Sequence, residues 1–139
     1  RCAETCMSTK ALYVEDVRFD RLIFSRCFDA MTLDRQISLR CVASVDAGVE
    51  ALRSSMPDLL FLDHRIPPYD SFAESLEVLV AAGFEGAAVI VSGLPTPSMY
   101  EAAAEGRPVH AVIDKRELNA AHLSGVIGPL LSRIPQETR

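Results

Sequence analysis

The sequence predicts an α/β fold of five β–α units, (βα)5, in which helices cover both faces of a doubly wound, parallel five-stranded sheet. Three observations predict this fold class. Short apolar runs without alternating polar residues recur along the chain, as in strands that are buried on both faces. Segments with a helical spacing of apolar residues separate these runs. Most of the runs end in polar residues, as expected where parallel strands bring side chains to one edge of a sheet.

The first unit combines a strand at residues 11–14 with a helix at residues 17–31. Asp16 stands just before the helical segment and is predicted to cap it. Apolar residues recur every four positions along this segment, and they predict its buried face. They are Phe19, Ile23, Cys27 and Met31.

The second unit starts with the more mixed run 37–45, whose polar interruptions predict an edge strand. A short helix is predicted at 46–54, and Pro57 closes it. The third unit follows with a fully apolar strand at 59–62 and a helix at 71–82.

The fourth unit has a strand at 87–91 and a helix at 97–105, which begins with a proline suited to a first turn. The fifth has a strand at 109–113 and a helix at 118–131. Pro129 lies inside this last helix, so we expect its final turn to be weak.

Composition and charge exclude several classes of protein. A chain of 139 residues that is 49% hydrophobic and 24% charged has the composition of one folded domain. We expect that domain at residues 10–132, after a flexible N-terminal extension at 1–9 and before a short tail at 133–139. The net charge of −5 disfavours DNA as a partner, and no apolar stretch approaches the roughly 18 residues of a membrane span.

The four cysteines show no disulfide framework. We interpret Cys2 and Cys6 as thiols of the N-terminal extension, and Cys27 and Cys41 as small, largely buried side chains. This usage favours a reducing compartment, so a cytoplasmic location is expected.

Polar residues follow four of the five predicted strands. Each has an ordinary interpretation by itself, such as a helix cap, a turn residue or a solvated charge. Because parallel strands end at the same edge, these residues are expected to meet as an acidic cluster flanked by a hydroxyl and an ammonium. The residues are Glu15, Asp16, Asp63, Ser92 and Lys115.

Such a cluster suits a divalent cation. Three neighbouring carboxylates repel one another, and Mg²⁺ favours hard oxygen ligands with substrate phosphate in its coordination sphere. An aspartate can then act as the nucleophile of phosphoryl transfer, while Ser92 and Lys115 stabilise the phosphoryl oxygens. The cluster therefore predicts a phosphate carried on a carboxylate.

On these residues the chain resembles the receiver domains of bacterial response regulators of the stand-alone type. The resemblance covers roughly residues 10–131. It depends on a combination of motifs rather than on any one residue: an acidic pair, an aspartate with a proline four residues later, a serine before a glycine, and a lysine. In this sequence these are Glu15-Asp16, Asp63 with Pro67, Ser92-Gly93 and Lys115.

The resemblance implies a flavodoxin-like strand order of 2-1-3-4-5. It also implies that Asp63 accepts the phosphoryl group, with Ser92 and Lys115 as the other catalytic residues. The protein is then a phosphoacceptor rather than an enzyme, with Mg²⁺-dependent self-phosphorylation and self-dephosphorylation. The implied magnesium ligands are Glu15, Asp16, Asp63 and the backbone carbonyl of Arg65.

The implied partners are proteins. A sensor histidine kinase or a phosphotransfer protein would donate the phosphoryl group in two-component or phosphorelay signalling. The signal would then reach a downstream protein through the face formed by residues 97–105, 109–113 and 118–131.

The chain departs from the family pattern at several positions. Val112 stands where the family usually has a switch aromatic, so read-out must differ. Lys115-Arg116 replaces the usual Lys-Pro step, and a trans bond is expected because cis costs about 3 kcal/mol without proline. Ser71 replaces a glycine, and two prolines within residues 93–97 are expected to stiffen the loop after Ser92.

The histidines and Arg65 have ordinary interpretations. His64 and Arg65 directly follow the expected phosphoacceptor and are interpreted as solvated loop residues; a role for Arg65 in limiting water access to the acyl phosphate stays open. His110 and His122 have no spaced partner and are interpreted as structural or surface residues.

Two other functions are compatible with parts of this pattern. A phosphorylation-independent pseudo-receiver that acts as a protein-interaction module is favoured by Val112, Arg116 and the stiffened loop after Ser92. The presence of Asp63, Ser92 and Lys115 opposes it. A phosphohydrolase with an aspartate nucleophile would need a second aspartate at the position of Arg65, and is therefore disfavoured. Lys10 is expected beside the loose N-terminus, which leaves Lys115 as the only lysine in the body of the domain.

Overall fold

The five strands form one sheet in which all neighbours are parallel, in the order β2-β1-β3-β4-β5. The computed structural model describes residues 9–134. The predicted fold class and strand order are confirmed, and β2 lies at an edge as expected. The strands are β1 (Thr9–Val14), β2 (Ile37–Val42), β3 (Leu59–Asp63), β4 (Ala87–Ser92) and β5 (Val109–Asp114).

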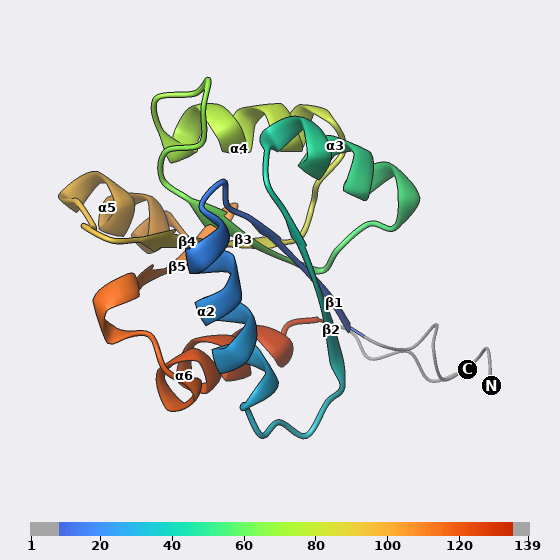
Figure 1. The fold of residues 1–139 in the computed structure, drawn as a ribbon, viewed down its shortest axis with the longest axis vertical. Coiled ribbons are helices and arrows are strands. Elements are labelled where there is room, and N and C mark those ends of the chain that lie inside the picture. The colour runs from blue at the N-terminus through green and yellow to red at the C-terminus, as the bar shows by residue number, and fades with distance from the viewer. Residues whose placement is uncertain (1–8, 135–139) are drawn as a thin grey trace.

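Helices cover both faces of the sheet (Figure 1). On one face, α3, α4 and α5 enclose one hydrophobic core, and on the other face α2 and α6 enclose a second core. The helices are α2 (Arg18–Asp29), α3 (Val45–Ser54), α4 (Phe72–Ala81), α5 (Pro97–Glu105) and α6 (Ala120–Leu131), with a short 3₁₀ helix, η1 (Lys115–Glu117), after β5. Among the described residues, no helix is long and apolar enough to cross a membrane.

The central strand β3 shows why the apolar runs are unbroken. Side chains of a strand alternate between the two faces of a sheet. Leu60 and Leu62 enter the core under α3 and α4, whereas Leu59 and Phe61 enter the core under α2 and α6. All four are fully buried, so neither face of the strand has room for a polar residue.

The start of α2 differs from the prediction. Asp16 does not cap this helix: the N-cap is Val17, and no side chain caps it. Instead, Oε2 of Glu15 accepts a hydrogen bond from the backbone N–H of Val17 at 3.0 Å. The carboxylate of Asp16 is thereby left free to face the edge of the sheet.

The predicted buried face of α2 is also wrong in part. Phe19 is 68% exposed and Ile23 is 38% exposed, whereas Phe24 and Phe28 are buried. Phe24 packs on Tyr13 of β1, with ring centroids 4.3 Å apart. A strict four-residue spacing drifts around a helix of 3.6 residues per turn, and the aromatic contact with the sheet decides which residues face inward.

Two further boundaries differ for identifiable reasons. β2 ends at Val42 rather than at residue 45, because Ser44 accepts a hydrogen bond from the N–H of Ala47 and caps α3. The final turn of α6 forms despite Pro129, since the buried side chains of Leu130 and Leu131 anchor it in the core.

Lys10 lies within β1, opposite Ser38 of β2. The expectation that Lys115 is the only lysine in the body of the domain is therefore wrong. The predicted extension and tail, with Cys2 and Cys6, fall almost entirely on residues 1–8 and 135–139, outside the described residues.

Candidate functional site

The predicted site residues meet at the carboxyl edge of the sheet. Glu15 directly follows β1, Asp63 ends β3, Ser92 ends β4 and Lys115 directly follows β5. The parallel register brings these strand ends together: Asp63 pairs with Val91, next to Ser92. The site is therefore a direct consequence of the topology.

Lys115 is the centre of this cluster. Its Nζ lies 2.7 Å from Oε1 of Glu15, 3.0 Å from Oδ1 of Asp63 and 2.8 Å from Oδ2 of Asp20. Asp20, in the first turn of α2, was not predicted as a site residue. Its only signal in the sequence is an acidic residue one helical turn after Asp16, which does not reveal a partner 95 positions away.

Glu15 is fully buried and firmly held. Its Oε1 accepts hydrogen bonds from the hydroxyl of Tyr13 at 3.0 Å and from Lys115. Burial raises the pKa of Glu15, and the neighbouring Asp63 adds to that rise in pKa, while hydrogen bonds from Lys115 and Val17 oppose it. The position of this carboxylate is thus set by several donors at once.

Burial by itself would lower the pKa of Lys115. The interactions with the carboxylates of Asp20, Glu15 and Asp63 outweigh that effect and hold the pKa of Lys115 above its ordinary value. The ammonium therefore stays charged at neutral pH.

The acidic residues fit a magnesium ion. Carboxylate oxygens of Glu15, Asp16 and Asp63 all lie within 4.8 Å of one another. Among the described residues, Asp16 accepts no side-chain hydrogen bond and the backbone carbonyl of Arg65 accepts none, so both keep free oxygen atoms. Hard oxygen donors with free lone pairs are the ligands that Mg²⁺ prefers.

Ser92 is buried at the end of β4. Its Oγ accepts a hydrogen bond from the backbone N–H of Leu94 at 3.1 Å, which fixes the oxygen while the hydroxyl proton remains free to be donated. The side chain therefore keeps a donor for an incoming oxygen.

Comparison with known proteins shows the fold. No protein-family model matches the chain, and no curated protein matches it in sequence. A signal receiver domain from Vibrio parahaemolyticus matches with a TM-score of 0.74 at 17% identity, covering 91% of this chain and 92% of that one. A response regulator receiver protein from Pseudoalteromonas atlantica matches with a TM-score of 0.69 at 18% identity, covering 91% and 99%.

A third similar structure is the receiver domain of a Francisella response regulator, with a TM-score of 0.70 at 14% identity over 92% of this chain and all of that one. The chain has the receiver-domain fold. Other similar structures with this fold come from longer proteins, such as the N-terminal domain of a three-domain protein from Carboxydothermus hydrogenoformans.

Residues of the loop after Asp63 hydrogen-bond to the start of α4. Nδ1 of His64 accepts a hydrogen bond from the N–H of Phe72 at 3.2 Å, so His64 helps to cap α4 and is not merely a solvated loop residue. Arg65 is exposed, as expected. Ser71, which stands where receiver domains usually have glycine, caps α4 by accepting from the N–H of Glu74.

Two further positions at which this chain differs from the receiver-domain pattern lie on and after β5. Val112 is half-buried against the core under α3, α4 and α5. The bond between Lys115 and Arg116 is trans, as predicted. Arg116 turns outward and pairs with Asp114 at 2.6 Å, away from the acidic cluster.

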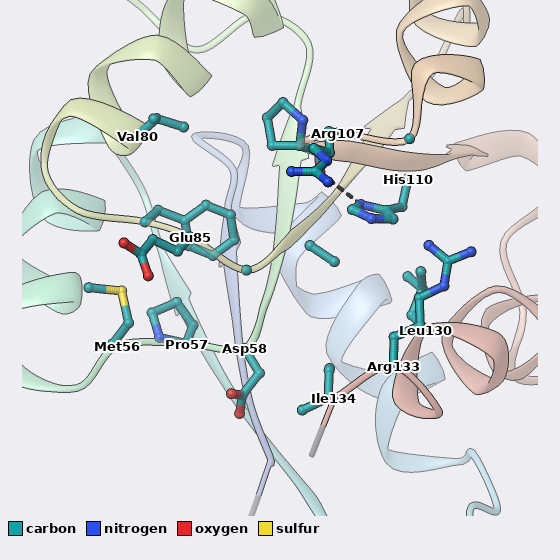
Figure 2. A pocket seen from close by; sticks show the side chains of 15 residues that line it. Met56, Pro57, Asp58, Val80, Glu85, Arg107, His110, Leu130, Arg133 and Ile134 are labelled. Atoms are coloured by element: carbon teal, nitrogen blue, oxygen red, sulfur yellow. Dashed lines mark hydrogen bonds between the residues drawn. The ribbon is translucent and has the colours of Figure 1, made fainter.

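A cavity lies at the other edge of the sheet. It has a volume of about 850 Å³ and is lined by residues around the amino ends of β3, β4 and β5 (Figure 2). His110 lines it, with Nδ1 donating to the carbonyl of Pro108 at 2.9 Å. None of the predicted site residues lines this cavity, so it is separate from the cluster around Lys115.

Proposed function

We propose that the protein is a phosphoacceptor in two-component or phosphorelay signalling, and that Asp63 receives the phosphoryl group with the help of Mg²⁺. The receiver-domain fold supports a role in such signalling. One observation carries the proposal: the Asp63 carboxylate lies 3.0 Å from the Lys115 ammonium and beside the carboxylates of Glu15 and Asp16.

In the proposed reaction a carboxylate oxygen of Asp63 attacks the phosphorus of the donor. A bond forms between that oxygen and phosphorus, and the bond from phosphorus to the donor nitrogen or oxygen breaks, with its electron pair leaving on the donor. Lys115 would pair with one phosphoryl oxygen and Ser92 would donate a hydrogen bond to another.

Magnesium bound by Asp16, Asp63, Glu15 and the carbonyl of Arg65 would neutralise charge on the transferring oxygens. The residues themselves do the positioning. Glu15 holds Lys115 beside the nucleophile, and the backbone N–H of Leu94 orients Ser92. The product stays on the protein, so the chain is proposed to be a phosphoacceptor with self-phosphorylation and self-dephosphorylation rather than an enzyme with a separate product.

The surface beside the site supports a protein donor. Val17, Phe19, Leu22 and Ile23 are exposed apolar residues at the start of α2, and we call this set the α2 patch. Its sequence brackets Asp20, a partner of Lys115. Exposed apolar residues grouped beside a reactive site are typical of protein-binding surfaces, and a histidine kinase or phosphotransfer protein would bring its phosphohistidine there.

A second face supports a downstream protein partner. Leu94 is 71% exposed before α5, and Tyr100 is 53% exposed on α5. The face of α5, β5 and α6 is therefore proposed to bind the target after phosphorylation. Cys27 and Cys41 are free thiols, which agrees with a proposed cytoplasmic location.

Acetyl phosphate tests the proposal directly. The protein is incubated with acetyl phosphate and Mg²⁺, and a phosphate-affinity mobility-shift gel is run for wild type and Asp63→Asn. A base-labile shift in wild type, lost in the variant and on chelation of Mg²⁺, is the expected result. The absence of a shift with acetyl phosphate and with a phosphohistidine donor would instead favour the phosphorylation-independent module.

A further inference from the structure

Asp20 gives the site an additional carboxylate. It belongs to α2 rather than to a strand end, and its Oδ2 accepts a hydrogen bond from Nζ of Lys115 at 2.8 Å. Its side chain is 30% exposed, whereas that of Glu15 is fully buried. Among the described residues, Lys115 is the only side chain that hydrogen-bonds to the Asp20 carboxylate.

An ammonium group has three N–H donors. Two of them are donated to Glu15 and Asp20, and the ammonium also forms an ion pair with Oδ1 of Asp63 at 3.0 Å. A phosphoryl group on Asp63 brings a charge of roughly −1.5 to −2 and needs a donor from Lys115. Glu15, Asp20 and the phosphoryl group would then compete for the donors of one ammonium group.

Of the three carboxylates, that of Asp20 can give up its contact with Lys115 at the smallest cost in free energy. Glu15 is buried and is held by Tyr13 and Val17 as well as by Lys115, so its release would leave a buried charge without its cation. The Asp20 carboxylate is partly exposed and can exchange Lys115 for water.

We propose that Asp20 is a positioning residue that competes with the phosphoryl group for Lys115. It holds the ammonium in the unphosphorylated protein and releases it when Asp63 is phosphorylated. This inference rests on the proposed function. Because Asp20 lies in the first turn of α2, its release connects the state of Asp63 to the helix that carries the α2 patch.

Four proteins test the competition: wild type, Asp20→Asn, Asp20→Glu and Asp29→Asn. The initial rate of Asp63 phosphorylation by acetyl phosphate is measured at saturating Mg²⁺. Asp20→Asn removes the competing charge, so we expect a rate about two- to fivefold above wild type, in keeping with the modest strength of partly exposed ion pairs. Asp20→Glu keeps the charge and Asp29→Asn removes one at the exposed far end of α2, so both are expected to behave like wild type.

A spectroscopic measurement separates competition from a general change in structure. The chain has only two lysines, so the NMR signal of the Lys115 side-chain ammonium is readily assigned. Beryllofluoride with Mg²⁺ serves as a stable phosphoryl mimic. It is expected to shift this signal in wild type toward the position found in Asp20→Asn, since both lack the ion pair between Lys115 and the Asp20 carboxylate.

The outcomes distinguish this inference from the proposed function. If wild type is phosphorylated and Asp20→Asn is no faster, or is slower, the competition is wrong while Asp63 remains a phosphoacceptor. If none of the four proteins is phosphorylated on Asp63, both proposals are wrong. A faster Asp20→Asn together with wild-type behaviour of the two control variants supports both.

Discussion

Lys115 carries a single positive charge among three carboxylates, and at the scale of the residue this geometry explains why a lysine is needed. Its Nζ lies 2.7 to 3.0 Å from oxygens of Glu15, Asp20 and Asp63, which stand directly after β1, in the first turn of α2 and at the end of β3. A compact ammonium can direct its donors at all three, whereas a planar guanidinium presents its donors in a fixed fork.

Lys115→Arg is therefore expected to fold and to bind Mg²⁺ but to be phosphorylated about tenfold more slowly than wild type, because one charge-assisted contact to the phosphoryl group is lost. The rate with acetyl phosphate and the Mg²⁺ affinity by calorimetry check this. Lys10→Arg, the same change within β1, is the control and is expected to leave both values unchanged. An unchanged rate in Lys115→Arg contradicts the role given to the ammonium.

Tyr13 holds the buried Glu15 carboxylate of the site in place. Its ring is buried against Phe24, and its hydroxyl donates to Oε1 of Glu15. Tyr13→Phe deletes this donor beside a buried carboxylate and is expected to lower the free energy of unfolding by about 2 kcal/mol. Urea unfolding measures it, with Tyr100→Phe, an exposed tyrosine, as the control; equal stability of the two variants would refute the structural role of the Tyr13 hydroxyl.

Which site residues the sequence reveals depends on where they stand. Glu15, Asp63 and Lys115 were predictable because each follows an apolar run, and parallel strands end at one edge. Asp20 was not, because its approach to Lys115 depends on the direction in which α2 leaves the sheet. No local pattern in the sequence encodes that direction.

At the scale of the element, α4 begins with two caps from the chain before it. Ser71 accepts from the N–H of Glu74, and Nδ1 of His64 accepts from the N–H of Phe72. A protonated Nδ1 cannot accept, and burial, followed by the nearby charge of Arg65, lowers the pKa of His64 below its ordinary value of 6.5. The loop after Asp63 is therefore tied to the start of α4 when His64 is neutral.

This contact makes stability depend on pH. Below about pH 6.5 the unfolded chain takes up a proton on His64 while the folded chain resists it, so stability falls as the pH falls through the folded pKa of His64. His64→Ala is expected to lose this component, whereas the control His122→Ala is expected to keep it. Urea unfolding at pH values between about 5 and about 8 measures the free energy of unfolding of each protein. Identical pH profiles for wild type and His64→Ala would contradict this prediction.

If the α2 patch binds the phosphohistidine donor protein, changing it should slow phosphoryl transfer from that protein. Phe19→Ala removes the most exposed aromatic side chain of α2 and is expected to slow transfer from a phosphohistidine donor protein about tenfold, as for the loss of a central contact residue. Phosphorylation by acetyl phosphate, which needs no docking, is expected to stay unchanged. Leu94→Ala on the other face is the control; if Phe19→Ala slowed both reactions equally, the patch would not be a docking surface.

The same helix shows where element-level prediction fails. The existence of α2 follows from its apolar spacing, but Phe19 and Ile23 were expected inside and lie outside. A run with phenylalanines at 19, 24 and 28 offers two overlapping apolar stripes. The ring contact of Phe24 with Tyr13 selects one of them, and this contact exists only once helix and sheet are packed together.

At the scale of the whole molecule, two hydrophobic cores on opposite faces of one sheet hold the strand ends in register. This explains why identity of 14 to 18% with solved receiver domains accompanies TM-scores of 0.69 to 0.74. The pattern of apolar runs is enough to predict a parallel α/β sheet, whereas the strand order came from the resemblance to receiver domains. Many different apolar residues can fill the same cores. The fold was therefore predictable in outline, while boundaries set by single caps, such as Ser44, were not.

The central claim is that this fold carries a phosphoryl group on Asp63, and borohydride trapping tests it most directly. After treatment with acetyl phosphate and Mg²⁺, borohydride reduces an aspartyl phosphate to homoserine, and tryptic cleavage after Arg53 and Arg65 releases one peptide that contains both Asp58 and Asp63. Asp58 lies at the opposite end of β3 and serves as an internal control. We predict conversion of Asp63 alone, lost without Mg²⁺; an unmodified Asp63, or conversion of Asp58 instead, would contradict the account.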